Sequence, residues 1–131
     1  MAARSLGNQA LVIGAGIGGL AAAGAVSDYF EEVIVLERDE LPGRVIPRAG
    51  TPQAQHTHAL LGGGERALGS LFPGFTAALK EGGAVPCRTG LDILAEVPGF
   101  DPFPQRDLGW DSYAMSRPLV EYTLRQELQK P

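Results

Sequence analysis

The residues best suited to chemistry form a glycine-rich turn. Positions 14–19 fit the pattern G-x-G-x-x-G. In this pattern the first glycine turns the chain out of a strand, the second lets the backbone approach a pyrophosphate, and the third allows close helix–strand packing. The start of the following helix carries partial positive charge that attracts phosphates. The predicted cofactor-binding residues of the turn are Gly14, Ala15, Gly16, Ile17, Gly18 and Gly19.

An acidic residue stands where such a site needs one. Glu37 follows the apolar run 33–36, about 18 positions after Gly19. A carboxylate there accepts hydrogen bonds from the ribose hydroxyls of an adenosine and repels a 2′-phosphate, which argues against NADP. Turn and acid together predict binding of a dinucleotide that contains ADP. These residues leave open whether it is FAD or NAD.

The elements that must position these residues are a strand, a helix and a second strand. The apolar run 10–13 ends at the glycine turn, as a strand buried in a parallel sheet does. Residues 18–29 predict a helix that is apolar nearly all round, and 33–36 predict the second strand. We therefore expect a βαβ unit over about 10–37 in an α/β, Rossmann-like dinucleotide-binding fold of the FAD/NAD(P)-binding type.

Beyond residue 37 we expect loops and a few more elements. The pattern predicts loops over 38–55 and 98–109, helices over 58–71 and 75–81, a strand over 91–97, and a helix that reaches residue 130. Ser116 is the expected N-cap of that last helix. Glu121 and Arg125, four residues apart, are expected to form an ion pair on its surface.

Composition excludes several classes. Eighteen glycines and ten prolines among 131 residues exclude a helical bundle, because both residues weaken helix interiors. Eleven basic against fifteen acidic residues give a net charge of −4, which predicts no nucleic-acid partner. The apolar run near the start is interrupted by glycines and too short for a membrane span.

Cysteine and histidine are scarce. A single cysteine, Cys87, excludes an internal disulfide framework and predicts a reducing, cytoplasmic setting. His56 and His58 are the two histidines, too few for a metal site of three or four ligands, so no metal is expected.

Three later motifs make a resemblance to a known family specific. They are Pro-Arg-Ala-Gly-Thr-Pro-Gln at 47–53, Gln-His-Thr-His-Ala-Leu-Leu at 55–61 and Ser-Arg-Pro-Leu at 116–119. With the strand and acid at 33–39, they resemble the N-terminal part of FAD-dependent oxidoreductases. More narrowly, the chain is similar to the flavoprotein monooxygenase superfamily that includes the aromatic hydroxylases. The resemblance extends over essentially all 131 residues.

The resemblance implies FAD as cofactor and assigns roles to four residues. Glu37 would hold the adenosine ribose, Arg48 and Arg117 would contact the phosphates or the ribityl chain, and Arg38 would lie near the adenine. Arginine suits phosphate because its planar fork of donors is permanently charged. The implied activity is oxygenation of an organic substrate with NAD(P)H as electron source. No catalytic acid or base is assigned, because the flavin carries the chemistry. His56 and His58 have either a structural role or one near the flavin.

The resemblance changes what the length of the chain indicates. One hundred and thirty-one residues suit one ordinary domain, yet the resembled family has a further Gly-Asp segment and a β-rich substrate domain. We therefore expect 1–131 to be the N-terminal portion of an FAD-binding domain, with 38–131 wrapping the cofactor and the substrate domain absent. The chain is then a fragment, or it completes its site with another chain. Alternatives are a non-catalytic or degenerate nucleotide-binding fragment and an NAD-binding Rossmann domain. An incomplete sheet would leave apolar surface uncovered.

Overall fold

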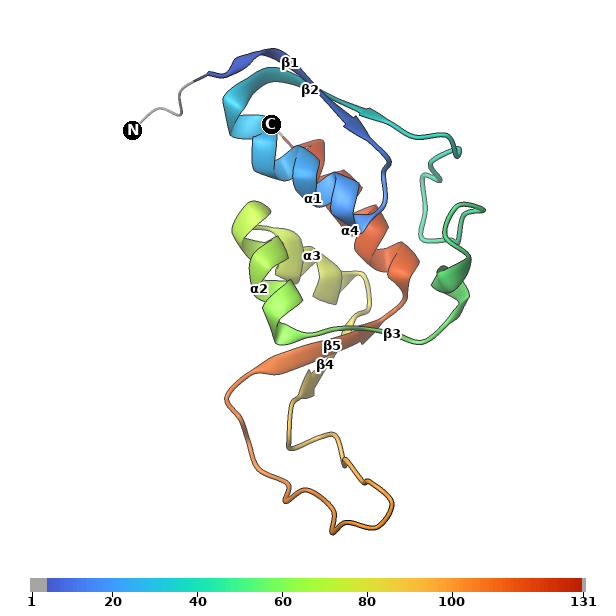
Figure 1. The fold of residues 1–131 in the computed structure, drawn as a ribbon, viewed down its shortest axis with the longest axis vertical. Helices are drawn as coiled ribbons and strands as arrows, with labels where there is room; N and C mark the ends of the chain where they lie inside the picture. Colours follow the sequence, from blue (N-terminus) through green and yellow to red (C-terminus); the bar gives the residue numbers. More distant parts are fainter. Residues whose placement is uncertain (1–4, 131) are drawn as a thin grey trace.

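A computed structural model describes residues 5–130 and shows a mixed α/β chain with two small sheets and four α-helices (Figure 1). In chain order the strands and helices are β1 (Gly7–Ile13), α1 (Ile17–Val26), β2 (Phe30–Leu36), β3 (His58–Leu60), α2 (Gly62–Leu71), α3 (Phe75–Glu81), β4 (Val85–Arg88), β5 (Asp111–Met115) and α4 (Arg117–Leu128). Short 3₁₀ turns occupy Ser27–Tyr29 and Pro52–Gln55.

The first sheet contains the predicted βαβ unit. β1 and β2 pair in parallel, from Gly7 opposite Phe30 to Ile13 opposite Leu36, and α1 connects them. Both strands are longer than predicted, and α1 ends at Val26 rather than at residue 29, where the chain tightens into a 3₁₀ turn. Strand, glycine turn, helix and second strand thus follow in the predicted order.

The second sheet is antiparallel, in the order β3-β5-β4, and it corrects two predictions. Residues 58–60 belong to a strand, not to a helix, because their backbone pairs with β5; the helix starts only at Gly62. The predicted strand over 91–97 is wrong, since those residues lie in a loop and the pairing partner of β5 is β4. β4 contains Pro86, so its sequence lacks the pattern typical of a strand. Proline is tolerated there because β4 is an edge strand.

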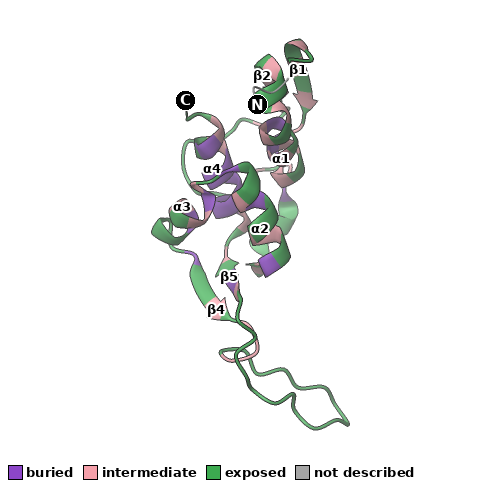
Figure 2. Cartoon of the chain, turned by 90° about the vertical axis from the view of Figure 1, so that its left-hand side faces the viewer, coloured by how far each residue is buried: buried purple, intermediate pink, exposed green. Residues whose placement is uncertain are grey.

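The main core lies where α1, α2, α3 and α4 meet, shown as the purple segments in Figure 2. Its most buried large side chains are Phe75, Leu79, Val120 and Leu124. The predicted helices over 75–81 and from 116 onward are confirmed, although α4 ends at Leu128. The Oγ atom of Ser116 accepts a hydrogen bond from the backbone N–H of Leu119 at 3.3 Å, as its predicted role as N-cap requires.

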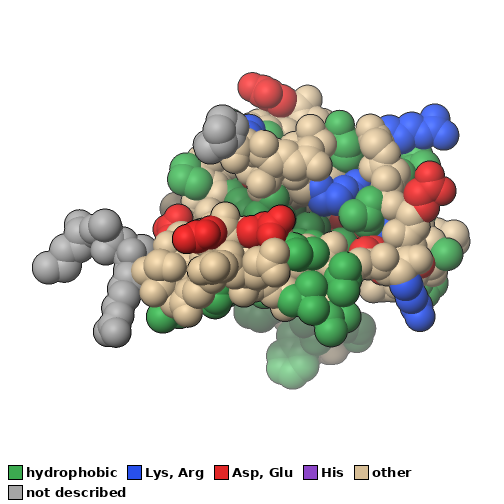
Figure 3. Space-filling model, turned by 90° about the horizontal axis from the view of Figure 1, so that it is seen from above, with side chains coloured by type: hydrophobic (Ala, Val, Ile, Leu, Met, Phe, Trp, Pro, Cys, Tyr) green, Lys and Arg blue, Asp and Glu red, His purple; other side chains and the backbone are tan. Residues whose placement is uncertain are grey.

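Within residues 5–130, two exposed apolar surfaces stand out. α1 and α4 lie on the same side of the β1–β2 pair (Figure 1), while the side chains of Leu11, Ile13 and Leu36 on the strands are exposed, Ile13 by 83%. Figure 3 looks onto the end of the molecule that carries these strands and shows hydrophobic side chains in green at that surface. The expectation of uncovered apolar surface is therefore confirmed for this sheet.

The second surface is the loop 89–110, which we call the arm. It extends from the hairpin of β4 and β5 away from the rest of the molecule (Figures 1 and 2). Phe100 and Phe103 on the arm are among its exposed aromatic residues. None of the helices within residues 5–130 combines the length and apolar character that crossing a membrane requires.

Candidate nucleotide-binding site

The glycine turn between β1 and α1 has the geometry its spacing predicts. Gly14 adopts φ +97°, a conformation that favours glycine, and its N–H donates to the Leu36 carbonyl at 2.7 Å. A Cβ atom on Gly19 would collide with the Gly14 carbonyl oxygen, so α1 packs against the strand end at a distance only glycine allows. Gly16 is the N-cap of α1 in an extended conformation.

Two arginines from distant parts of the chain converge on Gly16. A Cβ atom placed there would lie 3.8 Å from Nη2 of Arg117 and 3.9 Å from Nη2 of Arg48. Arg48 belongs to the loop that follows β2, and Arg117 is the first residue of α4. The space in front of Gly16 is thus bordered by two guanidinium groups and the N-terminal end of a helix, and side chains predicted to act together are brought together.

Glu37 connects the end of β2 to the turn. Its Oε2 atom accepts a hydrogen bond from the backbone N–H of Ala15 at 2.8 Å, and its Oε1 atom accepts from the N–H groups of Arg38 and Asp39 at 2.8 and 3.2 Å. These bonds, the one from Ala15 first, hold the pKa of the Glu37 carboxyl below its ordinary value, with help from the charge of Arg48. The carboxylate is therefore ionised at neutral pH.

The two arginines belong to a larger network of charges. Nη1 of Arg48 lies 2.8 Å from Oδ2 of Asp39 and 3.2 Å from Oε2 of Glu37. Nε of Arg48 donates to Oε2 of Glu121 at 3.1 Å, and Nε of Arg117 donates to Oε1 of Glu121 at 3.0 Å. Burial alone would lower the pKa of Arg48, but the hydrogen bond and charge of Glu121, the hydrogen bond of Asp39 and the charge of Glu37 outweigh it and raise the pKa. Arg48 thus stays charged although its side chain is only 7% exposed.

Sequence reasoning missed Asp39 and Glu121. Glu121 was expected to pair with Arg125; it instead binds Arg48 and Arg117, while Nη2 of Arg125 donates to the Pro42 carbonyl at 3.0 Å. The spacing of four between Arg117 and Glu121 was a usable signal. On an isolated helix, however, the opposite order, acid before base, is the more favourable one.

Other predicted residues fall outside this cluster or beside it. The Arg38 side chain is 85% exposed, and its Nε lies 4.0 Å from Oδ1 of Asp39, so Arg38 is not part of the arginine cluster and its place near the adenine stays a prediction. Gly18 faces open space, Ala15 is fully buried, and Ile17, the first residue of α1, packs against the core.

The histidines differ in their surroundings. His58 on β3 is half-buried, and burial together with the charge of Arg117 lowers its pKa, so it is neutral at pH 7. His56 is exposed in the preceding loop. Within residues 5–130 no three His, Cys, Asp or Glu side chains gather as a group that could ligate a metal.

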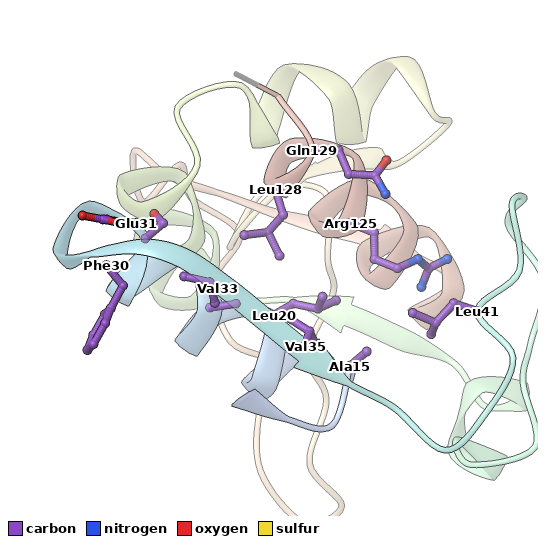
Figure 4. Close-up of a pocket in the computed structure, with 12 residues that line it drawn as sticks. Ala15, Leu20, Phe30, Glu31, Val33, Val35, Leu41, Arg125, Leu128 and Gln129 are labelled. Atoms are coloured by element: carbon purple, nitrogen blue, oxygen red, sulfur yellow. The ribbon is translucent and has the colours of Figure 1, made fainter. Parts of the chain in front are cut away.

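A separate cavity of about 410 Å³ lies between α1, β2 and α4. In Figure 4 the side chains of Leu20, Val33, Val35 and Leu128 point into it, with Arg125 and Leu41 toward one end. Ala15 is the part of the glycine turn that lines this cavity, and neither Arg48 nor Arg117 does. The cavity is therefore mainly apolar and distinct from the arginine-bordered space at Gly16.

Comparison with known proteins gives one informative match. No family model matches the chain. Protein Rv3254 of Mycobacterium tuberculosis is 35% identical over 126 residues, which make up 92% of this chain and 26% of that protein. The chain therefore spans about a quarter of the length of this curated relative, whose name states no activity.

Proposed function

We propose that this chain binds the ADP part of FAD at the glycine turn, as the FAD-binding portion of a flavin-dependent oxidoreductase. The observation that supports this proposal most directly is that the guanidinium groups of Arg48 and Arg117 face Gly16 at the start of α1. Two permanently charged guanidinium groups and a helix N-terminus surround a glycine, which has no side chain. This arrangement suits a diphosphate. A Cβ atom on Gly16 would project into this space at ordinary contact distance from both guanidinium groups, and the cationic donors around it suit a diphosphate in chemical type.

Each side chain then has a distinct task. Arg48 and Arg117 offer donors to phosphate oxygens, and the absence of a side chain on Gly16 leaves room for them. Glu37 is ionised and near the turn, so it can accept hydrogen bonds from ribose hydroxyls while it repels a 2′-phosphate. This arrangement favours FAD or NAD over NADP.

The choice of FAD over NAD rests on the resemblance. Arg48 and Arg117 come from two of the motifs that resemble flavoprotein monooxygenases, and their convergence on one turn supports that assignment. A bound flavin would supply the redox chemistry, with NAD(P)H as electron source and an organic substrate as acceptor of oxygen. Because the chain matches only 26% of its relative, we propose that further polypeptide completes the substrate site.

The direct test is titration of the purified chain with ADP, FAD and NAD in a calorimeter, combined with its visible absorbance. We expect binding of ADP and FAD, and yellow protein after incubation with FAD and gel filtration. A colourless chain that binds NAD in preference to FAD would favour the NAD-binding alternative. A chain that binds none of the three contradicts the assignment of the turn.

A substitution at Gly16 tests the location of the site. Gly16 has φ −75° and ψ 175°, so valine fits its backbone without strain while its side chain enters the space between the arginines. We expect Gly16→Val to weaken ADP binding by at least about tenfold, or 1.4 kcal/mol. Gly63→Val is the matched control, because a Cβ atom on Gly63 in α2 meets nothing within 4 Å. Equal affinity of both variants would argue against this turn.

A further inference from the structure

We propose that Glu121 is a positioning residue, which holds Arg48 and Arg117 so that the Nη2 atoms of both face the glycine turn. This inference rests on the proposed diphosphate site and extends it to a residue that would not contact the ligand. The Glu121 carboxylate is shared between the two arginines: one oxygen lies 3.1 Å from Nε of Arg48 and the other 3.0 Å from Nε of Arg117.

The choice of atoms in these bonds matters. Glu121 accepts a hydrogen bond from the Nε–H of each guanidinium group, and Asp39 accepts one from Nη1 of Arg48. The Nη2 atoms are the ones that lie 3.8 and 3.9 Å from the Cβ position of Gly16. The bonds to Glu121 therefore fix the orientation of both guanidinium groups through Nε, while their Nη2 atoms stay close to the turn.

Charge gives Glu121 a second role. Two guanidinium groups near one point repel each other, and burial makes the repulsion larger because the local dielectric is lower than that of water. Glu121 is only 4% exposed and lies between them, so its negative charge offsets the repulsion. The two arginines can then share one small space before any anion arrives.

The two arginines depend on Glu121 to different degrees. Arg48 also pairs with Asp39 and Glu37 and is almost fully buried. For Arg117, the ion pair with Glu121 is the one found among the described residues, and its side chain is more exposed. Loss of the Glu121 carboxylate should therefore make the side chain of Arg117 in particular more mobile. One of the two guanidinium groups would then no longer be held at the turn.

The test compares ADP with adenosine, because only ADP carries the diphosphate. In Glu121→Gln an amide NH₂ faces one of the two Nε–H donors, so one guanidinium loses its acceptor. We expect about tenfold weaker binding of ADP with unchanged binding of adenosine, measured by competition calorimetry. Glu127→Gln is the matched control, since Glu127 is a buried carboxylate on the same helix that pairs with Lys130; it should leave both affinities unchanged.

Each outcome decides something. A wild-type chain that does not bind ADP overturns the proposed function and this inference together. If the wild type binds ADP and Glu121→Gln keeps the same ratio of ADP to adenosine affinity, only the inference is overturned. Should Glu121→Gln fail to fold by circular dichroism, Glu121→Asp replaces it, because the shorter side chain keeps the charge and cannot reach both Nε atoms. If neither variant folds, Glu121 is structural and the inference is overturned.

Discussion

Glu37 shows how one side chain serves both the fold and the site. Its two oxygens accept three backbone hydrogen bonds, one of them from Ala15 in the glycine turn. Oε1 already accepts two of these bonds, whereas Oε2 accepts one and has two lone pairs, so Oε2 retains capacity for a hydrogen bond from a ribose hydroxyl. Glu37, which we expect to recognise a nucleotide, therefore also fixes the shape of the turn when no nucleotide is bound.

This role makes stability depend on pH in a defined direction. The pKa of Glu37 is lower in the folded chain than its ordinary value, so the stabilisation is complete above the ordinary value and is lost as the pH falls through the folded one. We expect Glu37→Gln to lose about 1 kcal/mol at pH 7 and to lose less stability than wild type on further acidification. Urea unfolding at several pH values measures both effects.

Glu40→Gln is the control for this prediction, because Glu40 is an exposed acid in the loop after β2. It should follow the wild-type pH profile. A Glu37→Gln variant whose acid sensitivity equals that of wild type would refute the proposed contribution of the Glu37 hydrogen bonds.

The residues of the site were predictable to unequal degrees. The turn and Glu37 follow from local spacing, because strand, glycines and acid lie within about 30 positions. Arg48 and Arg117 came only from the family resemblance, since no local pattern connects residues so distant in sequence. Glu121 was assigned to the wrong partner because helix spacing considers one helix alone, whereas a buried arginine from another segment determined its contacts.

At the scale of elements, prediction succeeded where a local cause acts. Apolar runs beside a glycine turn predicted β1 and β2, and Ser116 with a following proline predicted the start of α4. It failed in the antiparallel sheet, whose strands are defined by their partners. β3 is three residues long and β4 contains Pro86, so neither carries a periodic signal, and only pairing with β5 makes them strands.

The cap of α4 gives a test at this scale. Ser116→Ala removes the hydrogen bond to the Leu119 N–H and should cost about 1 kcal/mol, measured as a lower midpoint in thermal unfolding. Ser70→Ala is the control, because Ser70 is an exposed residue within α2 whose hydroxyl bonds only to the Ala67 carbonyl of the same helix. Since alanine favours helix interiors, Ser70→Ala should not destabilise the chain. Equal losses in both variants would contradict a special role for the cap.

At the scale of the whole molecule, the β1–β2 pair stands out because it is covered on one side. Parallel sheets are normally packed on both faces, yet Leu11, Ile13 and Leu36 are exposed here. Val12, which lies between Leu11 and Ile13 on β1, points to the other face of the strand, toward α1. Its Cγ1 atom would lie 3.7 Å from a Cβ atom on Gly19. The two faces of one strand therefore differ sharply in how much they contribute to stability.

Neighbouring residues on β1 test this difference. Ile13→Thr should change the free energy of unfolding, measured in urea, by no more than about 0.5 kcal/mol. Val12→Thr, with the same new side chain, should cost about 1–2 kcal/mol, because it places a hydroxyl in the packed interface with α1. A large loss in Ile13→Thr would show that the outer face is covered in the folded protein.

The packing of α1 against α4 also determines when the site can form during synthesis. Leu20 shares a core with Val120 and Leu124, about 100 positions later in the chain. Closing so long a loop costs entropy and slows folding. The glycine turn leaves the ribosome early, but its helix gains cover and Arg117 reaches it only after α4 has emerged. The proposed phosphate-binding centre would therefore be assembled late, and a nucleotide would act on a nearly folded chain by stabilising it rather than by guiding its first steps.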